Sequence, residues 1–114
     1  MPQYLLTMIQ PVGIVPGPDV LGPVMQKLGE FQKELEAQGS WVFAGGLAQP
    51  SSTTVLKKEG DDVLVIDGPY AESKEFLGGI TVIDVADLDE ALAWGKRYVD
   101  ATGLTAEVRP FLGR

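Results

Sequence analysis

The apolar positions of this chain fall into runs with two different periods, which predict six strands and two helices. Residues 20–38 and 88–99 repeat apolar side chains every three or four positions, as amphipathic helices do. In the second helix, the face expected to be buried consists of Leu88, Ala91, Leu92, Gly95 and Val99. Short apolar runs bounded by glycine, proline or acidic residues indicate strands. These strands are expected at residues 4–10, 41–46, 53–58, 63–66, 79–85 and 106–111.

Residues at the helix ends support these boundaries. Asp19 is a plausible N-cap for the first helix, and Gly39 is a plausible residue just beyond its end. Pro23 fits only within a first turn, so that helix could begin later. Asp87 with Glu90 three residues on predicts a capping box for the second helix.

The order of elements predicts an α+β fold on the ferredoxin-like plan, βαββαβ, with an added hairpin turning at residues 59–62. The length of 114 residues predicts a single domain, residues 1–114. Two helices on one face of an antiparallel sheet leave the other face bare. Because several strands carry apolar residues on both faces, we expect a homodimer that packs sheet on sheet.

Composition narrows the chemistry that is open to this chain. It contains no cysteine and no histidine, which excludes disulfides, thiolate nucleophiles, Ser-His-Asp triads and His-ligated metals. Acid–base chemistry would have to come from carboxylates, lysine or tyrosine. The net charge of −7 argues against nucleic acid and anionic membranes as partners. With no long apolar run and no basic start, we expect a cytoplasmic protein that needs no cofactor or metal.

The segment 67–79 is rich in glycine, proline and charge, and it lies between two apolar strands. Such inserts often carry a binding or catalytic site. Asp67 is the first candidate, as a general base whose pKa is raised by apolar neighbours. The alternative is that its carboxylate accepts hydrogen bonds from the turn that follows it, and both roles can coexist.

Other residues of this segment have two interpretations each. Tyr70 could donate a proton to a substrate oxygen, or it could be a core ring with its hydroxyl at the surface. Glu72 and Lys74 could be a second acid–base group and an anion holder, or a solvated face with a weak ion pair. Gly68 and Pro69 belong to the same candidate ligand-binding stretch.

Candidate positions outside that stretch are also open to two interpretations. Gly78 and Gly79, like Gly45-Gly46, lie at strand ends, where they could approach a ligand or simply meet a backbone requirement. Arg109 could clamp a substrate carboxylate or pair with an acidic residue. Trp94 and Tyr98 on the second helix are expected in the core. The loop at residues 11–19 could be a lid or a rigid connector.

Several motifs, in order and over nearly the whole chain, resemble the DGPF type of the YCII-related family. They are Ala44-Gly45-Gly46-Leu47, Thr53-Thr54-Val55, Asp67-Gly68-Pro69-Tyr70-Ala71-Glu72-Ser73-Lys74-Glu75, Leu77-Gly78-Gly79, Ile83-Asp84-Val85, Leu88-Asp89-Glu90-Ala91-Leu92 and Glu107-Val108-Arg109-Pro110. Tyr70 replaces the usual Phe of the motif. The resemblance implies a ferredoxin-like subunit of the dimeric α/β-barrel class, whose members generally bind ligands between the sheet and its helices.

The same resemblance implies two classes of function. Members of the barrel class include isomerases, monooxygenases and lyases, whereas others only bind ligands or assemble. A His-Asp pair used elsewhere in the family cannot operate here, because there is no histidine. The frequent association of DGPF proteins with sigma factors suggests regulation.

The sequence therefore leaves two hypotheses open. The first is a small-molecule-binding or regulatory accessory protein with a pocket at Asp67, Tyr70 and Arg109. The second is a cofactor-independent lyase or isomerase that acts on a small organic acid or phenol. In that enzyme Asp67 would be the base, with Tyr70 or Lys74 assisting.

Overall fold

The computed structural model describes residues 2–113, which form six strands, two α-helices and a short 3₁₀ helix. In chain order the elements are β1 (Gln3–Pro11), α1 (Pro18–Ala37), β2 (Trp41–Gly46), η1 (Pro50–Ser52), β3 (Thr54–Glu59), β4 (Asp62–Asp67), β5 (Glu75–Asp84), α2 (Leu88–Thr102) and β6 (Thr105–Pro110). All the predicted helices and strands are present, with shifted ends.

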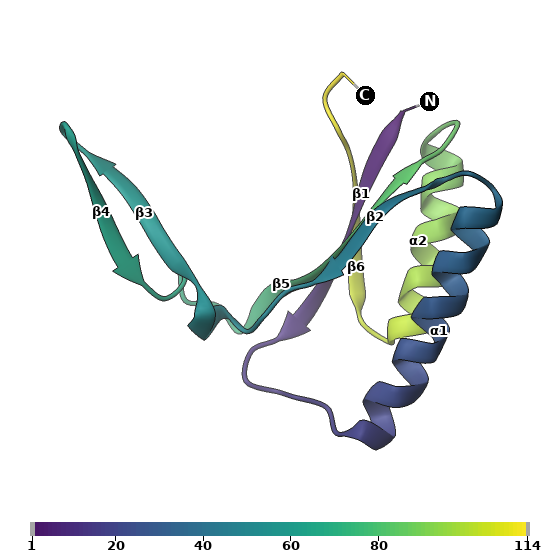
Figure 1. Ribbon diagram of the computed structural model, residues 1–114, viewed down its shortest axis with the longest axis horizontal. Coiled ribbons are helices and arrows are strands. Elements are labelled where there is room, and N and C mark those ends of the chain that lie inside the picture. Colours follow the sequence, from purple (N-terminus) through teal and green to yellow (C-terminus); the bar gives the residue numbers. More distant parts are fainter. Residues whose placement is uncertain (1, 114) are drawn as a thin grey trace.

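Four of the strands form one antiparallel sheet in the order β2-β5-β1-β6, with β1 and β5 in its centre. Both helices lie against the same face of this sheet (Figure 1). This arrangement confirms the predicted ferredoxin-like α+β fold. We call the sheet and the two helices the body of the molecule.

The core of the body lies between the sheet and the helices. Alternate residues of each strand point to this side, and among them Leu6 and Ile83 are fully buried. Phe31 of α1 meets two aromatic rings of α2: the ring of Trp94 edge-on at 5.7 Å between centroids, and the ring of Tyr98 stacked at 5.5 Å. These three rings therefore set the position of α2 against α1.

The first helix begins earlier than predicted, because Gly17 and not Asp19 is its N-cap. Pro18 occupies the first helical position, where a missing N–H costs nothing, and Asp19 lies in the first turn, where its charge favours the helix dipole. Pro23 consequently lies inside the helix, beyond the first turn. Gly39 has φ of 71° just after the C-cap, as predicted.

The second helix is capped as predicted but presents a different face to the core. Asp87 accepts a hydrogen bond from the Glu90 N–H at 2.9 Å. The Glu90 carboxylate accepts a hydrogen bond from the Ala86 N–H rather than from the N–H of the cap residue. Leu88, Leu92 and Val99, which were expected on the buried face, are exposed. The buried face is rotated around the helix axis relative to the predicted face. It consists of Ala91, Trp94, Gly95, Tyr98 and Ala101.

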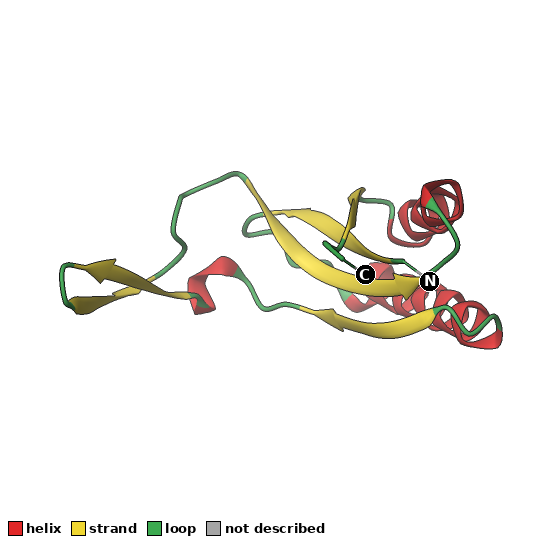
Figure 2. Cartoon of the chain, turned by 90° about the horizontal axis from the view of Figure 1, so that it is seen from above, coloured by secondary structure: helices red, strands yellow, loops and turns green. Residues whose placement is uncertain are grey.

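The face of the sheet away from the helices, here called the open face, is apolar in its middle. Leu5 pairs with Val82 across β1 and β5, and Phe43 of β2 pairs with Val82 from the other side. Phe43 is 54% exposed. In the part of the chain that the structure describes, no element covers this face (Figure 2).

The added hairpin is separate from the main sheet. β3 and β4 pair only with each other, from Thr54 opposite Asp67 to Glu59 opposite Asp62. Residues 54–67, which we call the arm, project from the end of the body on the side of the open face (Figures 1 and 2). The insert predicted at residues 67–79 is partly strand, since β5 begins at Glu75 and pairs with the end of β1.

No helix among residues 2–113 is long and apolar enough to cross a membrane.

Candidate functional site

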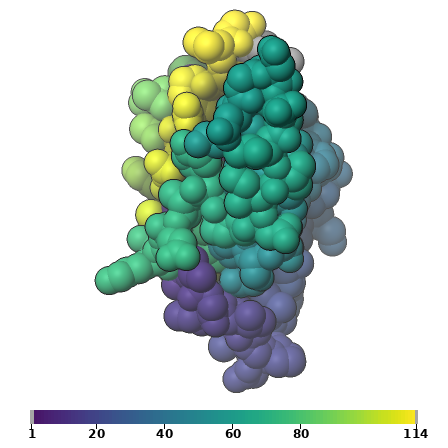
Figure 3. Space-filling model, turned by 90° about the vertical axis from the view of Figure 1, so that its left-hand side faces the viewer, coloured from purple at the N-terminus to yellow at the C-terminus, as the bar shows by residue number. Residues whose placement is uncertain are grey.

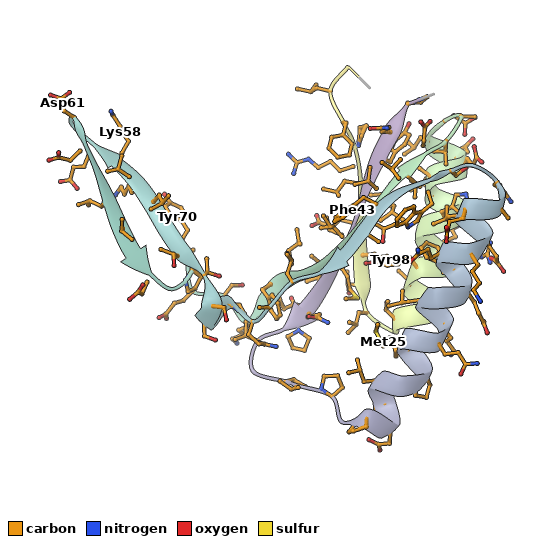
Figure 4. All side chains as sticks on the ribbon, in the orientation of Figure 1. Met25, Phe43, Lys58, Asp61, Tyr70 and Tyr98 are labelled. Carbon is orange, nitrogen blue, oxygen red and sulfur yellow. The ribbon has the colours of Figure 1, made fainter. Side chains whose placement is uncertain are left out.

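A cavity of about 600 Å³ lies between α1 and the sheet. Its walls come from α1, from Tyr98 and Thr102 of α2, from the ends of β1, β2 and β5, and from Ile14 and Pro16 of the connection before α1. We call it the helix–sheet cavity. Two of its lining residues, Met25 of α1 and Tyr98 of α2, are labelled in Figure 4.

The cavity exists because glycines replace side chains on the strands that form its floor. Gly46 of β2 lies opposite Gly79 of β5, and both line the cavity. A Cβ atom on Gly46 would meet no atom within 4 Å, so the space in front of this residue is empty. A Cβ atom on Gly79 would lie 3.1 Å from the Met8 methyl group and 3.6 Å from the Tyr98 hydroxyl oxygen. The glycine pair thus leaves this part of the floor without side chains, and the space between the sheet and α1 stays unfilled there.

A β-bulge places a polar side chain at this floor. The pairing of β1 and β5 passes from Met8 opposite Gly79 to Ile9 opposite Leu77, which leaves Gly78 as the extra residue. The Gln10 side chain lies over Gly78, where an added Cβ atom would come within 2.0 Å of its amide oxygen. Only glycine leaves room for Gln10 to line the cavity here.

The rest of the wall is mainly apolar. Met8, Met25, Leu28 and Phe31 contribute thioether, aliphatic and aromatic surface. Further apolar residues of this wall are well exposed, namely Ile14, Val20 and Leu21. Such a surface favours ligands that are themselves largely apolar.

The polar groups of the cavity are few and uncharged. They are the hydroxyls of Tyr98, Thr81 and Thr102, the amides of Gln10 and Gln32, and the indole N–H of Trp41. No carboxylate, lysine or arginine belongs to the lining within residues 2–113. Thr102 is already engaged, because its hydroxyl donates to the Tyr98 carbonyl at 3.0 Å. Tyr98 and Thr81, 3% and 4% exposed, lie at the inner end.

Tyr98 is the one lining residue with a perturbed ionisation among those described. Burial raises the pKa of its hydroxyl, and a hydrogen bond with the Thr81 side chain lowers it by a smaller amount. Because the net direction is upward from about 10, the hydroxyl stays protonated at neutral pH. It can therefore donate a hydrogen bond to a ligand but cannot serve as a base.

The predicted site residues do not gather at one place. Gly78 and Gly79 line the helix–sheet cavity. Asp67 ends β4 at the base of the arm and is exposed, and Tyr70 beyond it is 83% exposed (Figure 4). Lys74 is likewise exposed. Asp67, Tyr70 and Lys74 line neither this cavity nor the hollow described next.

A second, more superficial hollow of about 670 Å³ lies at the base of the arm. It is formed by residues 47–53, 71–73 and 75–77, with Val12 and Pro69. Of the predicted ligand-binding residues, Pro69 and Glu72 belong to it. Its acidic residues, Glu72 and Glu75, are both exposed.

Gly68 has a structural role at the same place. Its φ of 97° is a conformation that other residues adopt with difficulty, and its N–H donates to the Thr53 carbonyl at 2.7 Å. This bond closes the base of the arm one residue beyond the Thr54–Asp67 pair. Among the described residues, the Asp67 carboxylate takes no part in the turn, since it makes no hydrogen bond or ion pair.

Arg109 lies on the other side of the sheet from the cavity. It pairs with Leu5 in the register of β1 and β6, and Leu5 belongs to the open face. Its side chain is exposed. Arg109 is therefore placed to meet something packed on the open face, and not a ligand between sheet and helices.

Sequence reasoning placed Tyr98 in the core and gave no role to Thr81 or Gln10. Tyr98 is buried as predicted, but its hydroxyl reaches the cavity, which helical spacing alone does not indicate. The available signal was a threonine in an otherwise apolar strand, Ile80-Thr81-Val82-Ile83. A hydroxyl on the buried side of such a strand needs a partner, and Tyr98 provides it.

Comparison with known proteins identifies the family. The model of the YCII-related domain matches residues 5–111. An uncharacterized protein of Rhizobium meliloti (strain 1021), R00369, is 35% identical over 89 residues, which cover 76% of this chain and 72% of that protein. The chain therefore belongs to the YCII-related family.

Proposed function

We propose that this YCII-related protein binds a small, uncharged and largely apolar molecule in the helix–sheet cavity. The observation that carries the proposal is the lining: about 600 Å³ of space, apolar walls, and hydroxyl and amide groups with no charge among them. The ligand's one polar group would accept a hydrogen bond from Tyr98 at the inner end. Phenols, aromatic ketones and short esters have this pattern.

The uncharged lining argues against organic acids as ligands. A carboxylate that enters the cavity would lose its hydration and meet no cation in return. Desolvation of an unpaired charge costs far more than desolvation of a hydroxyl. Of the two ligand classes considered from the sequence, small organic acids and phenols, the lining therefore favours phenols and disfavours organic acids.

The same lining favours binding without turnover. Proton transfer needs a group that can accept a proton near neutral pH, and among the lining residues Tyr98 is held in its protonated form. A role as a ligand-sensing or carrier subunit fits these groups. The link to a sigma factor implied by the DGPF resemblance remains a prediction. Such a link would couple ligand binding to regulation.

The alternative, a lyase or isomerase with Asp67 as the base, has less support. Asp67 is exposed on the arm and lies outside both hollows, so no enclosed site surrounds its carboxylate. Asp67→Asn separates the two hypotheses. Unchanged binding in the cavity supports the binding proposal, and loss of a measurable turnover would support the enzyme.

Two related probes test the proposal directly. In calorimetric titrations at neutral pH, 2-naphthol should bind, and 2-naphthoate should bind at least about tenfold more weakly. The two molecules share a ring system and differ in one substituent, a neutral hydroxyl in the first and a larger, charged carboxylate in the second. Equal affinities, or tighter binding of 2-naphthoate, would contradict the proposal.

A further inference from the structure

The arm has no packing partner among residues 2–113. Among its strands β3 and β4, only Val55 is even partly buried, and every other residue is exposed. A two-stranded hairpin is marginally stable in water when nothing packs on it. Figure 3 shows the arm as the foremost layer on its side of the molecule.

Both faces of the arm carry exposed apolar side chains, with Lys57 on one face and Lys58 on the other. Residues opposite each other share a face, so Leu56 and Val65, each 68% exposed, lie together with Val63 on one face. Leu64 and Ile66 lie with Val55 on the other face. An apolar patch on both sides of an isolated hairpin is typical of a segment that is buried in an assembly.

The exposed area of the chain supports the same conclusion in numbers. The accessible surface is 7814 Å², whereas a folded monomer of 12.2 kDa exposes about 6,100 Å². The excess of about 1,700 Å² is twice the ~800 Å² that each partner loses in a stable interface of ordinary size. The radius of gyration, 16.2 Å, likewise exceeds the value of about 13 Å for a compact chain of this length.

The arm and the open face look onto the same space. In Figure 1 the helices cover one side of the sheet, and the arm stands off the other side, so that sheet and arm form a V. Phe43 lies on the side of the sheet that faces the arm (Figure 4). Whatever fills the V therefore buries the open face and the inner face of the arm together.

We propose that, in the homodimer predicted from the sequence, the body of one copy fills this space of the other, so that each arm clasps the body of its partner. A second copy is self-complementary in the required way: it brings its own uncovered sheet face and its own unpacked arm, and a two-fold axis satisfies both at once. The predicted sheet-on-sheet contact covers the open face, and the clasp adds the arm to the interface. The arm is then a dimerisation element and not a catalytic insert.

Amide hydrogen exchange of β3 and β4, measured across the concentration range in which sedimentation shows the mass to change, tests the clasp. We expect protection of the arm to rise with the dimer fraction. Protection that is independent of concentration would mean that the arm folds back on its own body, and would overturn the proposal. An unprotected arm in a dimer, or a monomer at every concentration, would overturn it as well.

A pair of matched variants gives a second test. Leu56→Glu adds a charge to the centre of the arm at a position that is exposed in the single chain, so folding of the body should be unaffected. The clasp predicts that the dimer dissociation constant rises at least about tenfold. The control is Leu88→Glu on the helix side, where Leu88 is 49% exposed. It should leave dimerisation unchanged, and equal effects of the two variants would contradict the clasp.

Discussion

The hydroxyl of Tyr98 on α2 and the side chain of Thr81 on β5 form a hydrogen bond at the inner end of the helix–sheet cavity. The bond joins the helix layer to the central part of the sheet and fixes the direction of the phenol. Stacking of the Tyr98 ring on Phe31 holds the ring in the same position. One residue therefore supports the fold and presents a polar group to a ligand.

Tyr98→Phe tests this double role. The variant keeps the ring and its stacking on Phe31, but it removes the hydrogen bond with Thr81, so we expect a loss of about 1 kcal/mol in the free energy of unfolding. Affinity for 2-naphthol should fall by about 1 kcal/mol as well, because a neutral donor is lost. Denaturant titration and calorimetry measure the two effects. Unchanged affinity with reduced stability would show that Tyr98 is structural only.

The raised pKa of Tyr98 predicts a specific pH dependence. Because the folded state holds the proton more tightly than the unfolded state, the stabilisation is complete below about pH 10. It is lost as the pH rises from there through the folded-state pKa. The free energy of unfolding, compared between wild type and Tyr98→Phe, should show a constant difference at neutral pH that shrinks above pH 10. A difference that grows with pH would contradict the assigned direction.

Gly46 offers a way to fill the cavity without disturbing its walls. A Cβ atom there meets nothing within 4 Å, and Gly46 is not among the glycines with positive φ, so Gly46→Leu should fold. Its side chain would occupy the space in front of Gly79. We expect affinity for 2-naphthol to fall by more than about tenfold.

The matched control is Gly46→Ala, which adds a single methyl group. It should fold equally well and keep most of the affinity. If both variants bind 2-naphthol like the wild type, the ligand lies elsewhere.

The base of the arm depends on Gly68, in the glycine-rich segment 67–79. Gly68→Ala places a side chain at φ of 97° next to the Gly68–Thr53 hydrogen bond. The left-handed conformation costs an L residue about 1–2 kcal/mol, so amide exchange in β3 and β4 should become about 5- to 30-fold faster. Gly22→Ala, in an open position of α1, should instead leave arm exchange unchanged. Equal arm exchange in the two variants would argue against this role for Gly68.

Local patterns predict the elements of this fold well. Strand periodicity places β1 and β2 within a residue of their observed ends, and the Asp87–Glu90 cap marks the start of α2. The buried face of α2 was only partly predicted. Trp94 and Tyr98 were expected in the core and are buried, but Leu88, Leu92 and Val99 follow the helical repeat as well as the true face does. The aromatic pair Trp94 and Tyr98 decides the orientation, since large rings bury more surface than leucines do.

The site was less predictable because it depends on relationships across strands. Gly46 and Gly79 are 33 positions apart, and only the pairing of β2 with β5 brings them together as an empty floor. The segment around Asp67 looked catalytic because turn chemistry and site chemistry use the same residue types. Gly68 of that segment has a structural explanation, because its positive φ and the hydrogen bond of its N–H close the base of the arm.

The central claim is that the helix–sheet cavity holds a neutral ligand, and the methionine methyl groups report on it directly. Met8 and Met25 line the cavity from β1 and α1. In a protein labelled with ¹³C at the methionine methyls, the signals of Met8 and Met25, assigned with Met8→Leu and Met25→Leu, should both shift as 2-naphthol is added. Saturation of both shifts at one dissociation constant would support the claim. Binding of 2-naphthol that leaves both signals unmoved would contradict it.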